Sequence, residues 1–146
     1  CIHTPMLSGL KGKGGGRMDS FDHKMSKSDP NNAIFVHDTP KKIEKKFRKA
    51  FLEVGNSDSP VYEIAEHIVL PYKGELRVEP KPEFGEPSTW TDIGSFIAAV
   101  GSGDVHPFDA KMAVARGLAE VLSPVVEHFE QNSALLDEVN RLTGSQ

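Results

Sequence analysis

The stretch from Asp104 to Glu130, DVHPFDAKMAVARGLAEVLSPVVEHFE, is the longest periodic segment of the 146-residue chain. Its apolar residues recur every three or four positions, which predicts a long amphipathic helix. The apolar face consists of Phe108, Met112, Ala115, Leu118, Leu122, Val125 and Phe129. Pro124 is expected to kink this helix or split it in two, because proline removes a backbone hydrogen bond and crowds the preceding turn. A last short amphipathic helix is predicted at 133–142.

A second amphipathic helix is predicted over 40–54. Asp38 or Thr39 is a suitable N-cap, and Pro40 suits the first helical position, where its missing N–H has no partner to lose. The apolar face consists of Ile43, Phe47, Ala50, Phe51 and Val54. The opposite face carries Lys41, Lys42, Lys45, Lys46, Arg48 and Lys49. This basic face either contacts an anionic partner or is simply solvated.

The middle of the chain alternates between helix and strand patterns. A helix capped by Ser59 is expected to end at Pro71. The alternating segment 75–79 predicts a short strand. A further helix is expected after a cap at Ser88 or Thr91. The predicted fold class is therefore mainly α, with one small hairpin.

The composition is typical of a globular protein, with 38% hydrophobic and 26% charged residues. No apolar stretch approaches the ~20 residues that cross a bilayer. The single cysteine, Cys1, excludes an internal disulfide and is typical of a reducing, cytoplasmic compartment. Because the chain begins with Cys1 rather than methionine, we expect either a piece of a larger protein or the product of ordinary N-terminal processing.

The charge is unevenly distributed along the chain. Residues 1–50 hold eleven Lys and Arg against five Asp and Glu, whereas residues 51–146 hold six against sixteen. The two parts therefore carry +6 and −10, which sum to the net charge of −4. The pattern favours an anionic partner for the basic end, or else a solvated charged face.

Residues 8–32 form a long loop rich in Gly, Ser, Lys, Asp and Asn. Within it, KMSKS at Lys24–Ser28 places two lysines among small polar residues, behind a run of glycines. Long loops in compact domains are usually functional or disordered. The residues alone therefore allow either a loop that grips an anion or a polar linker.

KMSKS resembles the signature loop of class I aminoacyl-tRNA synthetases. Its continuation, DPNNAIFVHDTPKKIEKKF, resembles the tyrosyl and tryptophanyl subgroup. The segment SGDVHPFDAKMAVARGLAEVLSPVVEHFE resembles the C-terminal helical domain of archaeal and eukaryotic tyrosyl-tRNA synthetases. IHTPMLSGL resembles the strand and turn that leave their Rossmann-type catalytic domain. The resemblance implies that residues 1–37 end a catalytic domain and carry the loop, and that 38–146 form a helical anticodon-binding domain.

The resemblance implies that the complete enzyme activates tyrosine with ATP and then acylates tRNA(Tyr). In this activation step pyrophosphate leaves a phosphorus atom of ATP, and positive charge is needed to stabilise the negative charge on the phosphates. Lys24 and Lys27 would be catalytic and hold the triphosphate, with Lys27 engaging most in the transition state. Met25 would pack near the adenine, while Ser26 and Ser28 would supply backbone or hydroxyl contacts. Mg²⁺ is expected with the ATP, and we predict no metal ligands in the chain itself.

Three residues match the family's anticodon-reading positions. Asp109 would accept both N–H groups of the first anticodon guanine, and Phe84 and His106 would lie on either side of the base. Glu83 and Glu86 depart from the family pattern around Phe84, so Phe84 matches the family less closely than Asp109 does. Each residue also has a plainer interpretation: Asp109 stabilises a helix N-terminus, Phe84 belongs to a core, and His106 is a cap or surface residue.

The chain lacks the His-Ile-Gly-His-type motif and the amino-acid pocket that this class needs. We therefore expect it to be inactive alone and to act within a larger, homodimeric enzyme. A tryptophan–tRNA ligase shares KMSKSDPN, although the His-Pro-x-Asp element argues against it. A non-catalytic tRNA-binding module is the other alternative.

Overall fold

The computed structural model describes residues 5–12, 24–26, 28–83, 85–134, 138 and 141. Its elements in chain order are α1 (Pro40–Arg48), α2 (Pro60–Ile64), the π-helical turn η1 (Ala65–Val69), α3 (Leu70–Lys73), β1 (Leu76–Val78), β2 (Ser88–Trp90), α4 (Ile93–Ser102) and α5 (Pro107–Gln131). The predicted mainly α fold with one small hairpin is confirmed. Within these residues, no helix has the length and apolarity needed to cross a membrane.

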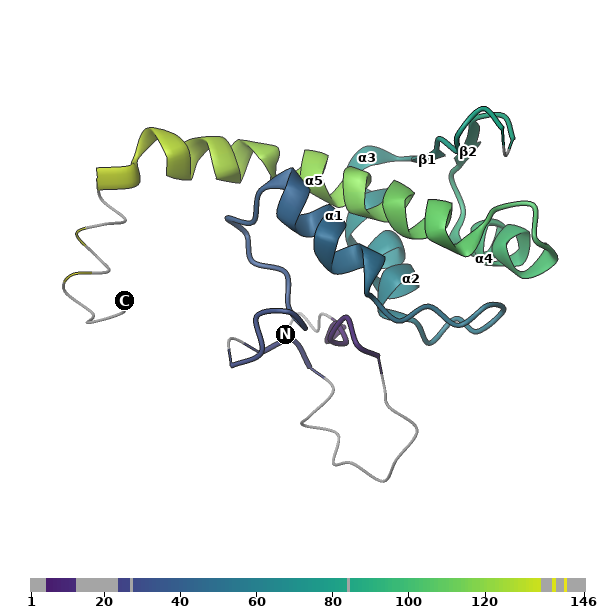
Figure 1. Ribbon diagram of the computed structural model, residues 1–146, viewed down its shortest axis with the longest axis horizontal. Helices are drawn as coiled ribbons and strands as arrows, with labels where there is room; N and C mark the ends of the chain where they lie inside the picture. Colours follow the sequence, from purple (N-terminus) through teal and green to yellow (C-terminus); the bar gives the residue numbers. More distant parts are fainter. Residues whose placement is uncertain are drawn as a thin grey trace, which may run out of the picture.

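α5 is the helix against which most of the other elements pack (Figure 1). It contacts α1, α2, η1, α3 and β1, and its buried residues all lie between Ala110 and Ala119. The last turns of α5, drawn in yellow, extend past the other helices. Phe108 and Val125, expected on the buried face, are therefore exposed at either end of it. The helix predicted at 133–142 lies largely outside the described residues.

α5 runs through Pro124 as one helix, so the predicted split does not occur. Proline at this position leaves the carbonyl of Glu120 without its usual helical donor. The hydroxyl of Ser123 donates to that carbonyl at 3.0 Å. This side-chain hydrogen bond replaces the missing one and lets the helix continue.

α1 ends at Arg48, six residues before the predicted end at Val54. The backbone N–H of Phe51 donates to the carbonyl of Leu10 at 2.6 Å, and not to a helical carbonyl. Leu10 is itself buried in the core. The N-terminal segment therefore draws the chain away from the helix, which leaves Phe51 and Val54 exposed.

The helix that begins at Pro60 continues through Pro71 to Lys73, so the expected end at Pro71 is wrong. The π-helical turn η1 ends at Val69, two residues before this proline. Such wide turns change the hydrogen-bond pattern locally and accommodate a residue without an N–H. Gly74, with φ of 78°, ends the helix in the left-handed conformation.

The strand predicted at 75–79 is confirmed as β1, which pairs antiparallel with β2. Leu76 lies opposite Trp90 and Val78 lies opposite Ser88. The expectation of a helix cap at Ser88 or Thr91 is wrong, because Ser88 belongs to this strand pair.

The cap of α4 is Asp92, whose carboxylate accepts from the backbone N–H of Ser95 at 2.7 Å and from its hydroxyl at 2.9 Å. These hydrogen bonds favour the charged form and lower the pKa of Asp92. Ser88 and Thr91 are also residue types that cap helices, so the sequence alone does not single out Asp92.

Candidate functional site

The start of the KMSKS loop is fixed to the helical part of the molecule. Lys24 pairs with Ser8 in an isolated antiparallel bridge. The backbone N–H and hydroxyl of Ser8 donate to the carboxylate of Glu63 in α2, at 2.7 and 2.9 Å. Lys27, the other predicted catalytic lysine, lies outside the described residues.

The end of the loop is folded into a turn. The hydroxyls of Ser26 and Ser28 are 2.8 Å apart, and the N–H of Asp29 donates to the carbonyl of Ser26 at 3.3 Å. Met25 is half-buried and packs against the hydrophobic core. Its predicted contact with adenine stays a prediction, as do the roles of the two serines.

Lys11, to which the sequence analysis gave no role, clamps this turn. Its ammonium lies 2.5 Å from the carboxylate of Asp29 and lowers the pKa of that group. Its backbone N–H donates to the side-chain carbonyl of Asn32 at 2.7 Å. A Cβ at Gly9 would overlap the same amide, so the close approach requires glycine. Only the structure could reveal this clamp, because its two sides are far apart in the sequence.

Beyond the turn, a buried ion pair connects the chain to α1. The ammonium of Lys46 lies 2.5 Å from the carboxylate of Asp38, and the two side chains are 12% and 4% exposed. Lys46 also donates to the carbonyl of Ala33 at 2.8 Å, and Asp38 accepts from the N–H of Phe35 at 2.9 Å. Asp38, considered as a helix cap, therefore orders the segment before α1, while Thr39 occupies the cap position.

His106 and Asp109, the predicted anticodon residues, lie together in a hollow of about 700 Å³. This anticodon hollow, as we call it, is formed by the N-terminus of α5, one side of α1 and the connectors beside them. Its lining is Glu44, Arg48, Glu79, Lys81, Gly103, Asp104, His106, Phe108, Asp109, Met112 and Arg116. Phe84 lies outside the described residues, but Lys81 from the same connector reaches the hollow.

His106 and Asp109 both combine a structural position with access to the hollow. The Nδ1 of His106 accepts from the backbone N–H of Phe108 at 3.1 Å, which makes it the N-cap of α5. In the neutral ring the proton is then on Nε2, which can donate. Asp109 lies in the first turn of α5, where the helix dipole favours a carboxylate.

Phe108 is a candidate that the sequence analysis assigned to the core. Its side chain is 45% exposed, and it lines the hollow between His106 and Asp109. Its helical spacing with Met112 favoured burial, but its place in the first turn puts it beyond the packed part of α5. The exposed ring offers a stacking surface for a base.

The hollow also holds both signs of charge. Arg48, Lys81 and Arg116 line it, and Arg116 lies 3.8 Å from Glu44 and 3.7 Å from Glu79. The cations are able to approach phosphates, while the carboxylate of Asp109 can accept N–H donors. Among the described residues, no group of three or more His, Cys, Asp and Glu side chains could hold a metal ion.

Comparison with known families matches residues 2–123 to the family described as tRNA synthetases class I (W and Y). The chain is 39% identical over 127 residues to the tyrosine–tRNA ligase of Picrophilus torridus. That match covers 86% of this chain and 38% of the relative. The chain therefore spans about two fifths of the length of this curated relative.

Two crystal structures of tyrosyl-tRNA synthetases share the fold. The enzyme of Pyrococcus horikoshii, complexed with L-tyrosine, is 32% identical with a TM-score of 0.78, over 90% of this chain and 38% of that one. The enzyme of Aeropyrum pernix is also 32% identical, with a TM-score of 0.77, over 98% of this chain and 39% of that one.

Proposed function

Because the chain belongs to the class I tRNA synthetases of the tryptophan and tyrosine family, we propose that it serves a tyrosine–tRNA ligase by gripping ATP with its KMSKS loop and reading the anticodon of tRNA(Tyr). The proposed division places the end of the catalytic domain in residues 1–37 and the anticodon-binding domain in 38–146. The observation that carries the proposal is the anticodon hollow, which brings His106, Phe108 and Asp109 together.

In the proposed anticodon site, the exposed ring of Phe108 and the imidazole of His106 offer faces on which an unstacked base can lie. Guanine presents two adjacent N–H donors on its Watson–Crick edge. The carboxylate of Asp109 has two oxygens that can accept both. Phe84 is proposed as the aromatic on the other side of the base.

In the proposed ATP site, the ammonium groups of Lys24 and Lys27 neutralise the triphosphate as pyrophosphate leaves. Glycines in the loop allow it to close over ATP and to reopen. The contacts of Ser8 with Glu63 hold the loop on the helical domain, and the ion pair of Lys11 with Asp29 ties the two sides of the loop together. Mg²⁺ is expected with ATP, but the described residues offer it no ligand cluster, and no step here depends on it.

The similarity to tyrosine–tRNA ligases and the His-Pro-x-Asp element at His106–Asp109 favour tyrosine over tryptophan. A non-catalytic RNA-binding module would keep the anticodon hollow. It would lack any effect of the loop lysines on amino-acid activation.

The change Asp109→Asn tests anticodon reading. Asparagine keeps the shape of the side chain but replaces one acceptor oxygen with a donor, so it cannot accept both guanine N–H groups. We expect the native chain to bind an anticodon stem-loop of tyrosine tRNA about 10-fold more tightly with guanine than with adenine at the first position. The variant should lose this preference, as measured by fluorescence anisotropy.

Asp104→Asn is the matched control, because Asp104 lines the same hollow but accepts from the hydroxyl of Ser102 at 2.7 Å. It should keep the preference for guanine. Equal loss of affinity for both RNAs in Asp109→Asn would leave Asp109 as a helix-end residue and contradict the proposal.

A further inference from the structure

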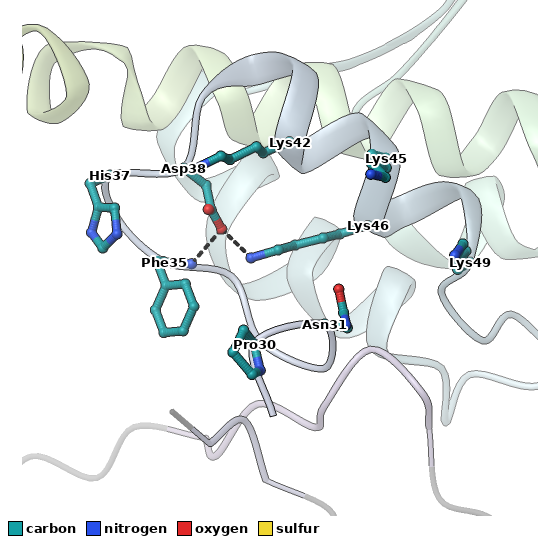
Figure 2. A pocket seen from close by; sticks show the side chains of 9 residues that line it. All are labelled: Pro30, Asn31, Phe35, His37, Asp38, Lys42, Lys45, Lys46 and Lys49. Carbon is teal, nitrogen blue, oxygen red and sulfur yellow. Dashed lines mark hydrogen bonds and ion pairs between the residues drawn. The ribbon is translucent and has the colours of Figure 1, made fainter. Parts of the chain in front are cut away.

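A second hollow, of about 390 Å³, lies on the other side of α1 between this helix and the segment that follows the KMSKS loop (Figure 2). We call it the lysine hollow. Its lining is Pro30, Asn31, Phe35, His37, Asp38, Lys42, Lys45, Lys46 and Lys49. The predicted roles of the loop and of the anticodon residues use none of these side chains.

The lysine hollow carries a strong positive charge. Four lysines line it against a single carboxylate, Asp38, and that carboxylate is already paired with Lys46. This leaves Lys42, Lys45 and Lys49, whose residues are exposed. No hydrogen bond or ion pair joins their ammonium groups to any other residue that the structure describes, and Figure 2 shows them along one side of α1.

The spacing of these three lysines suits an extended polyanion. Lys42 and Lys49 are seven residues apart, which is about 10 Å along a helix axis. A row of this length suits successive phosphates of a nucleic-acid strand better than a single small anion. The basic face of α1 therefore has the geometry of a backbone-binding surface.

The opposite wall of the hollow is aromatic. The rings of Phe35 and His37 are stacked, with centroids 5.6 Å apart and planes 8° apart, and the ammonium of Lys46 lies 4.7 Å from the Phe35 centroid. Lysines beside aromatic rings are typical of surfaces that bind unpaired or distorted nucleic-acid strands. The combination of a lysine row with an aromatic wall favours a nucleic acid over an acidic protein partner.

The lysine hollow and the anticodon hollow lie on different sides of α1. Glu44 and Arg48 line the anticodon hollow, whereas Lys42, Lys45 and Lys49 line the other. One RNA that occupies both must therefore pass over α1. Pro30 and Asn31 bring the lysine hollow next to the end of the KMSKS loop.

We propose that Lys42, Lys45 and Lys49 bind the phosphodiester backbone of the tRNA outside its anticodon arm. This inference rests on the proposed function, because it takes the RNA to be the one whose anticodon lies in the anticodon hollow. The buried Asp38–Lys46 pair is a positioning element, since it holds the aromatic wall against α1.

Binding of the chain to a full-length tyrosine tRNA transcript and to its isolated anticodon stem-loop tests the proposal. For full-length tRNA, Lys45→Gln and Lys49→Gln should each lose about 3-fold in affinity, and the triple variant with Lys42→Gln about 30-fold. Each removed contact should lower the slope of log K against log[salt] by about 0.7 to 0.9. Binding of the isolated stem-loop should be unchanged.

Lys41→Gln is the matched control, because Lys41 is an exposed lysine of α1 that lines neither hollow. It should bind both RNAs like the native chain, and all variants should keep the native thermal unfolding midpoint. An equal loss of tRNA affinity in Lys41→Gln would mean that the overall positive charge of α1 attracts the RNA, and it would overturn the proposal. An equal loss on the stem-loop, or no loss in the triple variant, would overturn it as well.

Binding of inorganic triphosphate tests whether the lysine hollow instead holds the phosphates of a nucleotide. If it binds native chain but not the triple variant, while tRNA binding is unaffected, the hollow is a nucleotide-phosphate site and the proposal is wrong. The two proposals can also fail separately. If the native chain binds the guanine and adenine stem-loops equally, anticodon reading is contradicted, but the affinity for full-length tRNA can still depend on Lys42, Lys45 and Lys49.

Discussion

At the scale of single residues, the Asp38–Lys46 pair carries the clearest consequence for stability. Both side chains are almost fully buried, and Asp38 also accepts from the N–H of Phe35. A buried pair adds little net stability relative to apolar residues, but removing one member strands the charge of the other. The pair is therefore better understood as ordering the segment between the KMSKS loop and α1.

The change Asp38→Ala should lower the free energy of unfolding by about 3 kcal/mol, because it leaves the Lys46 ammonium without a counter-charge. Urea unfolding followed by circular dichroism measures this. Lys41→Ala, at an exposed site on the same helix, should change it by less than about 0.5 kcal/mol. A small effect in Asp38→Ala would show that Lys46 reaches solvent and that the pair does not order the segment.

At the scale of elements, α5 and η1 pack closely where Gly117 faces Val69. A Cβ at Gly117 would lie 2.6 Å from a methyl carbon of Val69, which is buried. No Cβ is tolerated at that distance without movement of the backbone or the valine. The two helices therefore approach as closely as they do because residue 117 is glycine.

Gly117→Ala should destabilise the chain by about 1 to 3 kcal/mol from overpacking, partly offset by the roughly 1 kcal/mol higher helix propensity of alanine. Gly101→Ala in α4 is the control, since its new Cβ would meet its nearest neighbour at 3.8 Å. It should leave stability unchanged or raise it. Adding Val69→Ala to Gly117→Ala should recover part of the loss; no recovery would contradict the contact as its cause.

Sequence patterns predicted the elements better than their ends. The long helix, the helix after Pro40 and the strand at 75–79 follow from apolar periodicity, which reports local burial. The early end of α1 depends on a hydrogen bond from Phe51 to Leu10, and the continuation through Pro71 depends on the π-helical turn. Such contacts are invisible to a pattern read along the chain.

The candidate sites likewise contain some residues that a sequence motif predicts and others that only the structure brings together. His106 and Asp109 were found through a motif, and the structure brings them into one hollow. Phe108 was assigned to the core because its spacing fits the apolar face, which ends before the first turn of α5. The clamp by Lys11 and the lysine hollow join segments that are distant in sequence, so no local pattern indicates them.

At the scale of the whole molecule, the loop and the helical domain are mechanically joined. Leu10 is buried in the helical core, Ser8 bonds Glu63 of α2, and Asp38 pairs with Lys46 of α1. Both hollows are built on α1, one on each side. A tRNA held by this domain would therefore be placed relative to the KMSKS loop by direct packing.

The central claim is that the KMSKS loop serves amino-acid activation while the helical domain serves tRNA recognition. The most direct test is the single-turnover rate of tyrosyl-adenylate formation, without tRNA, by a complete tyrosine–tRNA ligase that carries this chain in place of its own matching segment. Lys27→Ala should lower this rate by about 10²- to 10³-fold at saturating tyrosine, because a cation that stabilises the departing pyrophosphate is lost. Asp109→Asn should leave it unchanged. A native rate in Lys27→Ala, or an equal loss in Asp109→Asn, would contradict this division of roles.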